Sequence, residues 1–422
     1  MRRWVRVVVV LAALGALALG VLHFGILERS AVADGLEKPL SKEALTKLAV
    51  RGRYLVVAAD CYACHTYKDG PPWAGGLPFE TPFGTIHATN ISPDPEHGIG
   101  KWTRRDFHRA LRDGIAPGNR HLYPAMPYAS YRDLTADDVD AMYAYLMTLE
   151  PVPQANVSND VNFPSNIRTL IGAWNLFALR APEPPDEAKS AAWNRGRYVT
   201  DALGHCGECH TPRNFMMAMQ RDRYLHGAIL EGVEAPDITR DTLALVGFEP
   251  EGLARFMRLG LSPLGSMTGP MFEVVHFSTQ YLDDADLAAM ATYLLGEPPP
   301  PVKPVVPARV SAKTGESGRR TWFALCAGCH GIEGQGVPHV SVPMRTNSSL
   351  RIPSARGFLT SVMHGIAQQD FPGLERMQAM PGFAAHLGDQ EIADLATWAR
   401  ASWGGQGIEV TAADVALLRR SN

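Results

Sequence analysis

The sequence has no dense basic cluster beyond its N-terminus and no second long apolar run, and each absence excludes a class of protein. The formal net charge is −3 and basic residues do not cluster beyond the N-terminus, so a nucleic-acid partner is not expected. After the N-terminal segment, no second apolar stretch reaches the length of a membrane-spanning helix. With 46% hydrophobic and 20% charged residues the chain is not disordered, and its 422 residues predict roughly two to four domains.

The N-terminus combines a positively charged start with an apolar run. Three arginines lie among the first six residues, residues 7–22 are apolar, and a small-x-small sequence follows at residues 31–33. This order is typical of a secretory signal. The run also approaches the length of a spanning helix, about 20 residues. Residues 1–33 are therefore predicted to be a signal peptide or a membrane anchor, and either one places the chain after Ala33 outside the cytoplasm.

All 6 cysteines belong to one repeated motif. An even count in an exported chain suggests disulfides, but the spacing here is C-x-x-C-H at residues 61–65, 206–210 and 326–330. This is the attachment motif of c-type haem. Two thiols on one helical turn form thioethers with the two vinyl groups, and the adjacent histidine lies under the iron as its proximal ligand. The predicted haem-binding residues are Cys61, Cys64, His65, Cys206, Cys209, His210, Cys326, Cys329 and His330.

Two other kinds of site also use paired cysteines. A single C-x-x-C can be a redox-active dithiol, and two such pairs can bind zinc. Neither site requires a histidine directly after the second cysteine, and neither predicts that this histidine occurs in all three motifs. Three covalently bound haem c groups are therefore the expected cofactors.

A haem iron that only transfers electrons needs a second axial ligand, which methionine or histidine can supply. Met126 and Met271 each follow their motif histidine by 61 residues, and Met380 follows the third motif histidine by 50 residues. A proline lies beside each methionine, which predicts a fixed extended loop. The predicted iron ligands are His65, Met126, His210, Met271, His330 and Met380.

Met267 and Met377 are nearby competitors for two of these positions. The shared offset of 61 residues favours Met271 over Met267. A Met-Pro pair occurs both at residues 126–127 and at residues 380–381, which favours Met380 over Met377.

The three motifs divide the chain into similar repeats. A glycine and an aromatic residue precede each motif in a segment that predicts a short helix. Each proposed methionine is followed by a helix with a capping residue and early acidic residues. The glycines are Gly52, Gly196 and Gly318, and the helix starts are Thr135, Asp283 and Gly388 or Asp389. Each repeat is thus an α-helical haem domain of about 100 residues.

Several segments around the motifs are similar to those of a known family. Between residues 50 and 405 the chain resembles the tri-haem cytochrome c subunits of bacterial membrane-bound dehydrogenases, such as the alcohol and gluconate dehydrogenase complexes. The segments with this resemblance are residues 81–86, 89–94, 98–102, 121–128, 205–214 and 402–404.

The resemblance implies an electron relay. In that family a catalytic subunit with a quinone (PQQ), flavin or molybdenum cofactor oxidises an alcohol, polyol, sugar acid or aldehyde. The cytochrome then passes the electrons to ubiquinone or another respiratory acceptor. The resemblance also implies three haems with His/Met ligation and a location on the periplasmic side of the inner membrane.

The expected fold class is all-α, with three tandem class I cytochrome c-like domains after the N-terminal signal or anchor segment. Proline-rich stretches mark the connections between these domains. The predicted divisions are signal or anchor 1–33, first domain 42–150, connector 151–190, second domain 191–297, proline-rich linker 298–311, third domain 312–405 and tail 406–422.

One segment departs from a simple repeat of the first domain, and one histidine of the first domain is a competing candidate ligand. The second domain has Pro-Asp-Ile-Thr at residues 236–239, where the first has Thr-Asn-Ile-Ser at residues 89–92. His87, which we expect in the loop before Asn90, is an alternative iron ligand, although a surface histidine is the more common case.

The leading hypothesis is an electron-transfer subunit without substrate chemistry of its own. No convincing nucleophile or acid–base constellation accompanies the haem motifs, so no catalytic residue is assigned. One alternative is a peroxidase-like haem enzyme with an open iron, which would be the second haem if Met271 were not a ligand. The other is a free-standing respiratory c-type cytochrome.

Overall fold

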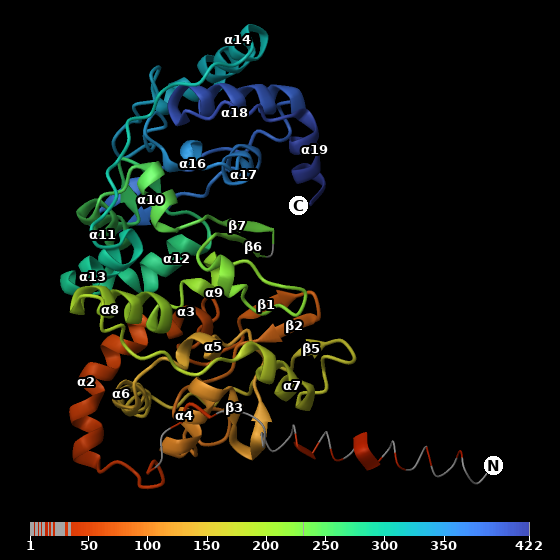
Figure 1. Cartoon of the computed structure of the whole chain (residues 1–422), viewed down its shortest axis with the longest axis vertical. Helices are drawn as coiled ribbons and strands as arrows, with labels where there is room; N and C mark the ends of the chain where they lie inside the picture. Colours follow the sequence, from red (N-terminus) through yellow and green to blue (C-terminus); the bar gives the residue numbers. More distant parts are fainter. Residues whose placement is uncertain are drawn as a thin grey trace. The chain divides into compact units, whose positions relative to one another are not determined.

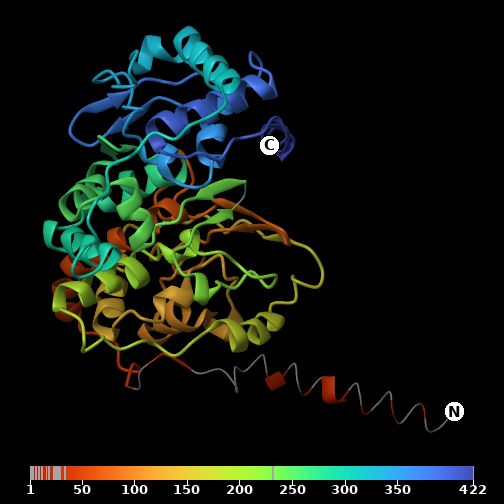
Figure 2. The ribbon, with the colours of Figure 1, turned by 45° about the horizontal axis from the view of Figure 1, so that its top comes forward.

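The computed structural model describes residues 35–230 and 232–421, with residues 4, 7, 10, 13–15, 17, 20, 21 and 30–32 of the N-terminal segment. The predicted signal or anchor, residues 1–33, lies for the most part outside the described residues. The chain forms two compact units, which are mainly helical (Figures 1 and 2). The first comprises Met1–Ala188, Tyr198–Glu208 and Arg213–Gln220, and the second comprises Lys189–Arg197, Cys209–Pro212 and Arg221–Asn422. None of the described helices is both long and apolar enough to cross a membrane.

Helices of the first unit begin at polar capping residues. The side chain of Thr135 accepts a hydrogen bond from the N–H of Asp138, which confirms the predicted helix start. Thr103 accepts the equivalent bond from Asp106. The elements are α2 (Lys42–Ala58), α3 (Cys61–His65), α4 (Arg104–Asp113), η1 (Pro117–Asn119), α5 (Tyr128–Tyr131), α6 (Ala136–Leu146), α7 (Thr169–Ala178) and the π-helical η2 (Tyr198–Leu203). The short helix α9 (Gly207–His210) begins in the first unit and ends in the second.

The second unit contains the remaining helices. Asp283 and Gly388 occupy the predicted N-cap positions, and the N–H of Gly388 donates to the carboxylate of Glu391 at 2.9 Å. The elements are α8 (Ala191–Arg197), η3 (Arg221–Arg223), α10 (Arg240–Val246), α11 (Pro250–Leu259), α12 (Pro270–Phe277), η4 (Thr279–Tyr281), α13 (Asp284–Leu295), α14 (Ala312–Thr321), η5 (Trp322–Cys326), α15 (Ala327–His330), α16 (Ser348–Arg351), α17 (Arg356–His364), α18 (Asp389–Gly404) and α19 (Ala412–Ser421).

Short antiparallel strands supplement the helices, and the all-α expectation did not include them. The first unit has a sheet of β1 (Pro78–Thr81), β2 (Gly84–His87) and β5 (Asp160–Val161), with strand order β1-β2-β5. The remaining strands form two-stranded ribbons. These ribbons are β3 (Ile115–Ala116) with β4 (Arg120–His121), β6 (Ala228–Leu230) with β7 (Val233–Ala235), β8 (Leu261–Ser262) with β9 (Gly265–Ser266), and β10 (Gln369–Phe371) with β11 (Glu375–Met377).

A helix pair of the same design accompanies each haem motif. The helix before the motif packs against the closing helix, in the pairs α2 with α6, α8 with α13 and α14 with α18. The glycine predicted from the sequence lies at each crossing. A Cβ added to Gly52, Gly196 or Gly318 would lie 1.8, 1.9 or 2.3 Å from the carbonyl oxygen of Ala141, Ala289 or Asp394. The three preceding segments therefore share a glycine because only glycine lets the two backbones approach this closely.

An arginine–aspartate pair reinforces two of the three crossings. Arg51 donates to Asp138 in the first pair at 2.7 Å, and Arg195 donates to Asp286 in the second, also at 2.7 Å. The third repeat has Ser317 and Glu391 at the corresponding positions. There the glutamate carboxylate instead accepts from the N-terminus of α18.

The core around the third motif is apolar and rich in tryptophan. Trp322 is 2% exposed, and its ring centroid lies 4.8 Å from that of Trp403 and 5.9 Å from that of Trp398. Val415 and Leu418 of α19 are buried in the same cluster. Residues beyond 405 therefore contribute to this core, while the seven sequence divisions themselves stay a prediction.

Candidate haem sites

The first attachment motif forms the short helix α3. It follows Asp60, whose φ of 51° turns the chain sharply out of α2. The Nδ1–H of His65 donates to the carbonyl oxygen of Thr89 at 2.6 Å. Since a carbonyl only accepts, this bond fixes the proton on Nδ1 and leaves the Nε2 lone pair for a metal. Burial lowers the pKa of His65 from its ordinary value and so keeps the imidazole neutral.

The second motif repeats this arrangement with a different sequence. His210 is 5% exposed, and its Nδ1–H donates to the carbonyl oxygen of Pro236 at 2.7 Å. Burial lowers its pKa as well. Residues 236–239 thus supply the carbonyl that residues 89–92 supply to His65. The departure noted in the sequence leaves this contact intact because a backbone carbonyl does not depend on the side chain.

The third motif has the same contact at a longer distance. The Nδ1–H of His330 donates to the carbonyl oxygen of Val342 at 3.1 Å, and burial lowers the pKa of His330. In all three motifs the histidine therefore presents Nε2 as its free nitrogen. This is the arrangement that a metal-ligating histidine adopts when a carbonyl orients its ring.

Three glycines that the sequence analysis did not single out support these histidines. Each donates its N–H to the carbonyl oxygen of a motif histidine: Gly75 to His65 at 2.8 Å, Gly227 to His210 at 2.7 Å and Gly336 to His330 at 2.8 Å. Their φ angles are 75°, 78° and 73°.

A side chain would fit at none of these three glycines. A Cβ would approach the backbone of Thr89, Asp237 or Pro343 to 2.4, 2.7 or 2.7 Å. Thr89 itself supplies the carbonyl that accepts from His65. Asp237 and Pro343 directly follow the residues whose carbonyls accept from His210 and His330. The number of residues between histidine and glycine differs among the three motifs, so no fixed spacing marked the glycines in the sequence.

The thiols at the three sites fit covalent attachment of haem. None of the six cysteines, all of which lie in the described part of the chain, forms a disulfide. Burial raises the pKa of Cys61 well above its ordinary value, and burial raises the pKa of Cys326 to about 11. Each site therefore offers two thiols and one imidazole on a single short turn, which is the donor set that haem c requires. The nine attachment residues and the count of three haems stay predictions.

The methionine candidates of the first two repeats occupy matching positions. In the first unit α4 ends at Gly114, the ribbon β3–β4 follows, and the N–H of Leu122 donates to the Gly114 carbonyl at 2.7 Å. In the second unit α11 ends at Gly260, the ribbon β8–β9 follows, and the N–H of Met267 donates to the Gly260 carbonyl at 2.8 Å.

Met267 therefore corresponds to Leu122, and Met271 corresponds to Met126, since each candidate ligand lies four residues further on. This match supports the choice of Met271 over Met267. The assignment of both ligands stays a prediction.

The predicted extended loop around Met271 is wrong. Met271 lies in the first turn of α12, directly after Pro270 at the first helical position. Proline is tolerated there because the first N–H groups of a helix have no partner within it, and its fixed φ suits the helix. Proline beside a methionine therefore indicated a helix start in this case. Met126 lies instead in a turn just before α5.

The third candidate, Met380, lies in a loop against the core of its repeat. Its backbone exchanges two hydrogen bonds with Ile366, at 2.9 and 2.8 Å. Met380 and Cys326 pack against the same buried cluster. Its competitor Met377 lies in β11 and pairs with Gln369. Met380 and Cys326 thus lie against the same buried core. This common position supports the prediction that Met380 is the ligand of the third haem.

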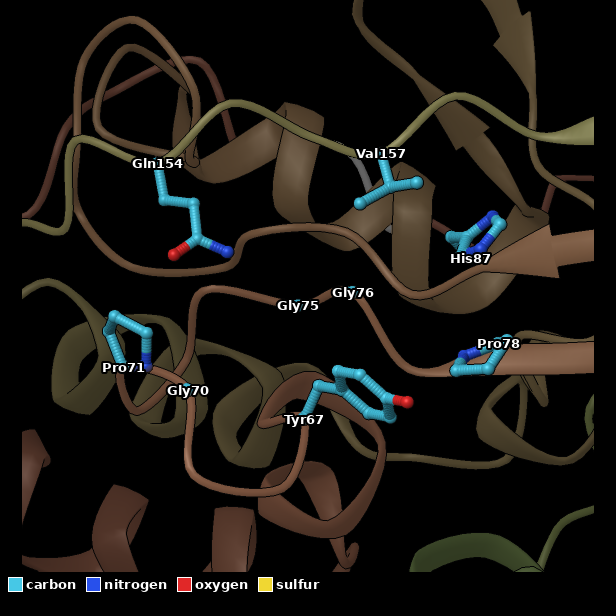
Figure 3. A pocket seen from close by; sticks show the side chains of 9 residues that line it. All are labelled: Tyr67, Gly70, Pro71, Gly75, Gly76, Pro78, His87, Gln154 and Val157. Atoms are coloured by element: carbon cyan, nitrogen blue, oxygen red, sulfur yellow. The ribbon is translucent and has the colours of Figure 1, made fainter.

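His87 lies at the end of strand β2 and not in a loop, which corrects the expectation from the sequence. It lines a pocket of about 330 Å³ with Tyr67, Gly75 and Val157 (Figure 3). Its backbone N–H donates to the side chain of Asn159 at 2.9 Å. Its position on β2 provides no specific support for the role of iron ligand.

The chain that leads into the second motif packs against α5 and α6. The hydroxyl of Tyr198 donates to the carboxylate of Asp138 at 2.6 Å, and the hydroxyl of Ser130 donates to the carboxylate of Glu208 at 2.8 Å. Burial and the charge of Asp138 raise the pKa of Tyr198. These buried contacts explain why Tyr198–Glu208 belongs to the first unit although the sequence divisions assign it to the second domain.

Comparison with known proteins identifies similar chains. The family model described as cytochrome c matches residues 49–150 and 315–403, which contain the first and third motifs. A subunit of the nicotinate dehydrogenase of Pseudomonas putida is 41% identical in an alignment of 361 positions, which covers 83% of this chain but only 30% of that protein. The fructose dehydrogenase cytochrome subunit of Gluconobacter japonicus is 35% identical in an alignment of 401 positions, which covers 87% of this chain and 82% of that one. The gluconate 2-dehydrogenase cytochrome c subunit of Pantoea cypripedii is 36% identical in an alignment of 428 positions, gaps included, which covers 96% of this chain and 94% of that one.

Proposed function

The chain belongs to the family of cytochrome c subunits of bacterial dehydrogenases and transfers electrons, and we propose that it does so with three covalently bound haem c groups. One observation carries the count of three. The second motif, outside the segments matched by the family model, has the same histidine–carbonyl and glycine–histidine contacts as the other two. A redox dithiol would not require this geometry around each histidine, and the described residues contain no group of three or more histidine, cysteine or acidic side chains that could hold a zinc ion.

The chain's own residues have defined tasks at each site. The two thiols would hold the haem through thioether bonds, the histidine Nε2 would ligate the iron, and Met126, Met271 and Met380 would each supply one further ligand. When bound, haem iron supplies one-electron redox chemistry. The carbonyls of Thr89, Pro236 and Val342 orient the rings and raise the basicity of the histidines.

We further propose that the electron donor is a catalytic dehydrogenase subunit. The relatives are named for fructose, alcohol, gluconate and nicotinate dehydrogenases. These names support a catalytic subunit that oxidises an alcohol, a polyol, a sugar acid, an aldehyde or a related substrate. Its cofactor would be of the PQQ, flavin or molybdenum type. The electrons would leave to ubiquinone or another respiratory acceptor on the periplasmic side of the cell membrane. The positively charged and apolar N-terminal segment supports export to that side.

Haem content and spin state test the proposal directly. Mass spectrometry of the chain expressed with a c-type haem attachment system should show three haems, and Cys206→Ala with Cys209→Ala should remove one of them. The oxidised protein should contain only six-coordinate, low-spin iron. A high-spin iron that reacts with peroxide would favour the peroxidase-like alternative instead.

Purification from membranes tests the partner. A dehydrogenase subunit that co-purifies with the cytochrome and reduces it on addition of substrate is the expected result. A cytochrome that never associates with such a subunit would contradict the assignment and favour a free-standing carrier.

A further inference from the structure

Tyr131 of α5 contacts the chain beside both the first and the second attachment motif. Its hydroxyl donates to the carbonyl oxygen of Ala59 at 3.0 Å, two residues before Cys61. Its ring lies edge-on to the ring of His205, with the centroids 5.6 Å apart, and Cys206 is the next residue. All of these residues belong to the first unit. One side chain thus contacts both segments that lead into two haem-attaching cysteines, the backbone of Ala59 and the ring of His205.

Tyr131 is held rigidly in this position. It is 3% exposed, on a helix that follows directly after the Met126 turn. Its neighbour Ser130 donates to Glu208, whose other carboxylate oxygen accepts from Arg213 at 2.7 Å. Because Glu208 lies between the two cysteines of the second motif, this chain of contacts ties α5 to the motif itself.

A second connection between the same two segments runs through the buried carboxylate of Asp138. Asp138 at the start of α6 accepts from Tyr198 at 2.6 Å and from Arg51 of α2 at 2.7 Å. Arg51 lies on the helix before the first motif and Tyr198 lies in the segment before the second. The two lead-in segments therefore share one carboxylate, which restricts their relative movement. Rigid, fully partnered polar networks of this kind specify a single arrangement.

We propose that Tyr131 is a positioning residue that sets the rate of electron exchange between the first and second haems. The proposal rests on the proposed function because it requires haem at both motifs. In the exchange, one electron leaves the ferrous haem and the ferric haem gains it, and no bond or proton is transferred. The tunnelling rate falls steeply with the separation of the two groups. Within the first unit, a side chain that fixes Ala59 against His205 limits how far the attachment points at Cys61 and Cys206 can move apart.

Two substitutions of Tyr131 separate the effect of its hydrogen bond from the effect of its ring contact. Tyr131→Phe keeps the ring against His205 and removes the hydrogen bond to Ala59. Tyr131→Leu removes both. Tyr143→Phe is the matched control because its hydroxyl also donates to a backbone carbonyl, that of Trp102, at 3.0 Å. That contact lies apart from both attachment motifs in the sequence.

The measurement is intramolecular electron exchange in the full chain with its haems attached, after flash reduction by a one-electron donor. The variant Met126→Ala serves to identify the phase that involves the first haem. It removes the proposed methionine ligand of the first iron, so the spectrum of that phase should change. We expect this phase to slow in Tyr131→Phe, to slow further in Tyr131→Leu, and to keep its rate in Tyr143→Phe. Haem content and the three reduction potentials should stay the same in all three tyrosine variants. A general loss of structure would change them, so this control separates a specific effect from unfolding.

The outcomes separate the two proposals. If Tyr131→Leu retains all three haems and the original exchange rate, Tyr131 has no positioning role, and the proposed function stands. Equal slowing in Tyr131→Phe and Tyr143→Phe would also overturn the inference, since the effect would then be unspecific. If the unmodified chain has no haem at the first or second motif, the proposed function fails, and the inference fails with it.

Discussion

Gly196 of α8 lies so close to Ala289 of α13 that an added Cβ would come within 1.9 Å of the Ala289 carbonyl oxygen. The same relationship joins Gly52 to Ala141 and Gly318 to Asp394. The glycines therefore mark the points where the first helix of each repeat crosses the last. Each crossing lies 8 to 10 residues before the first cysteine of a haem motif.

Gly196→Ala should destabilise the second repeat. The new methyl group must push two packed helices apart, and overpacking of this kind costs roughly 1–3 kcal/mol. The thermal unfolding temperature of the haem-loaded protein measures the effect. Gly252→Ala is the control, because Gly252 lies in helix α11 with no atom within 4 Å of an added Cβ. That variant should be as stable as the original or slightly more stable, since alanine favours helix. Equal stability of Gly196→Ala and the original chain would contradict the close crossing.

Gly336→Ala should alter the third haem site without removing the haem. Its Cβ would meet the nitrogen of Pro343 at 2.7 Å, and this backbone adjoins the Val342 carbonyl that accepts from His330. A displaced carbonyl makes His330 a weaker donor to the iron, which disfavours the ferric state. We therefore expect a higher reduction potential for one of the three haems, measured by a spectroscopic redox titration.

A glycine at a similar backbone angle provides the control for this prediction. Gly373 has a φ of 82°, close to the 73° of Gly336, but no atom lies within 4 Å of a Cβ added there. Gly373→Ala thus introduces the strain of an alanine with a positive φ, but its Cβ does not collide with a neighbouring backbone. If both variants shift the potential equally, the strain alone is responsible and the carbonyl has no specific role.

Sequence patterns predicted the features that depend on local chemistry. The three C-x-x-C-H motifs specify their own short turns, and the structure places each motif histidine beside a carbonyl that orients it. The glycines at the helix crossings also appeared in the sequence as a repeat. Thr135 was recognisable as a helix cap because its capping bond spans only three residues.

Features that depend on distant contacts could not be predicted in this way. The partners of the motif histidines are backbone carbonyls, which leave no mark in the sequence, and the spacing to Gly75, Gly227 and Gly336 varies. The pairing of Tyr198 with Asp138 joins residues 60 positions apart, and it assigns the segment before the second motif to the first compact unit. Met271 was expected in a loop because proline is compatible both with loops and with the first turn of a helix.

Acid should destabilise the first unit through Asp140. Burial alone would raise the pKa of this carboxyl, but hydrogen bonds from His108, at 2.9 Å, and from Arg104 hold it below its ordinary value. A carboxyl with a lowered pKa in the folded state stabilises the fold above the pKa it has when unfolded, about 3.9. That contribution is lost as the pH falls through the folded-state value.

Asp140→Asn tests this pH dependence. The amide cannot titrate, so the variant should be less stable at neutral pH and should lose less stability between about pH 5 and pH 2. Thermal unfolding across that range measures both effects. Asp370→Asn is a suitable control because Asp370 pairs with Arg376 at the surface, and such pairs contribute little. An Asp140→Asn profile parallel to that of the original chain would show that this network does not contribute to the acid sensitivity.

Met271→Ala and Met267→Ala should differ sharply, although the two residues are only four positions apart. Met271 matches Met126 in its position after the preceding helix and ribbon, whereas Met267 takes the place of Leu122. Loss of Met271 should leave the second haem attached, convert one iron to high spin and lower one potential, because methionine ligation raises it. Met267→Ala should leave all three irons low-spin. Optical and electron paramagnetic resonance spectra of the oxidised variants would distinguish the two cases. High-spin iron in Met267→Ala alone would assign the ligand to Met267, despite the matching backbone positions.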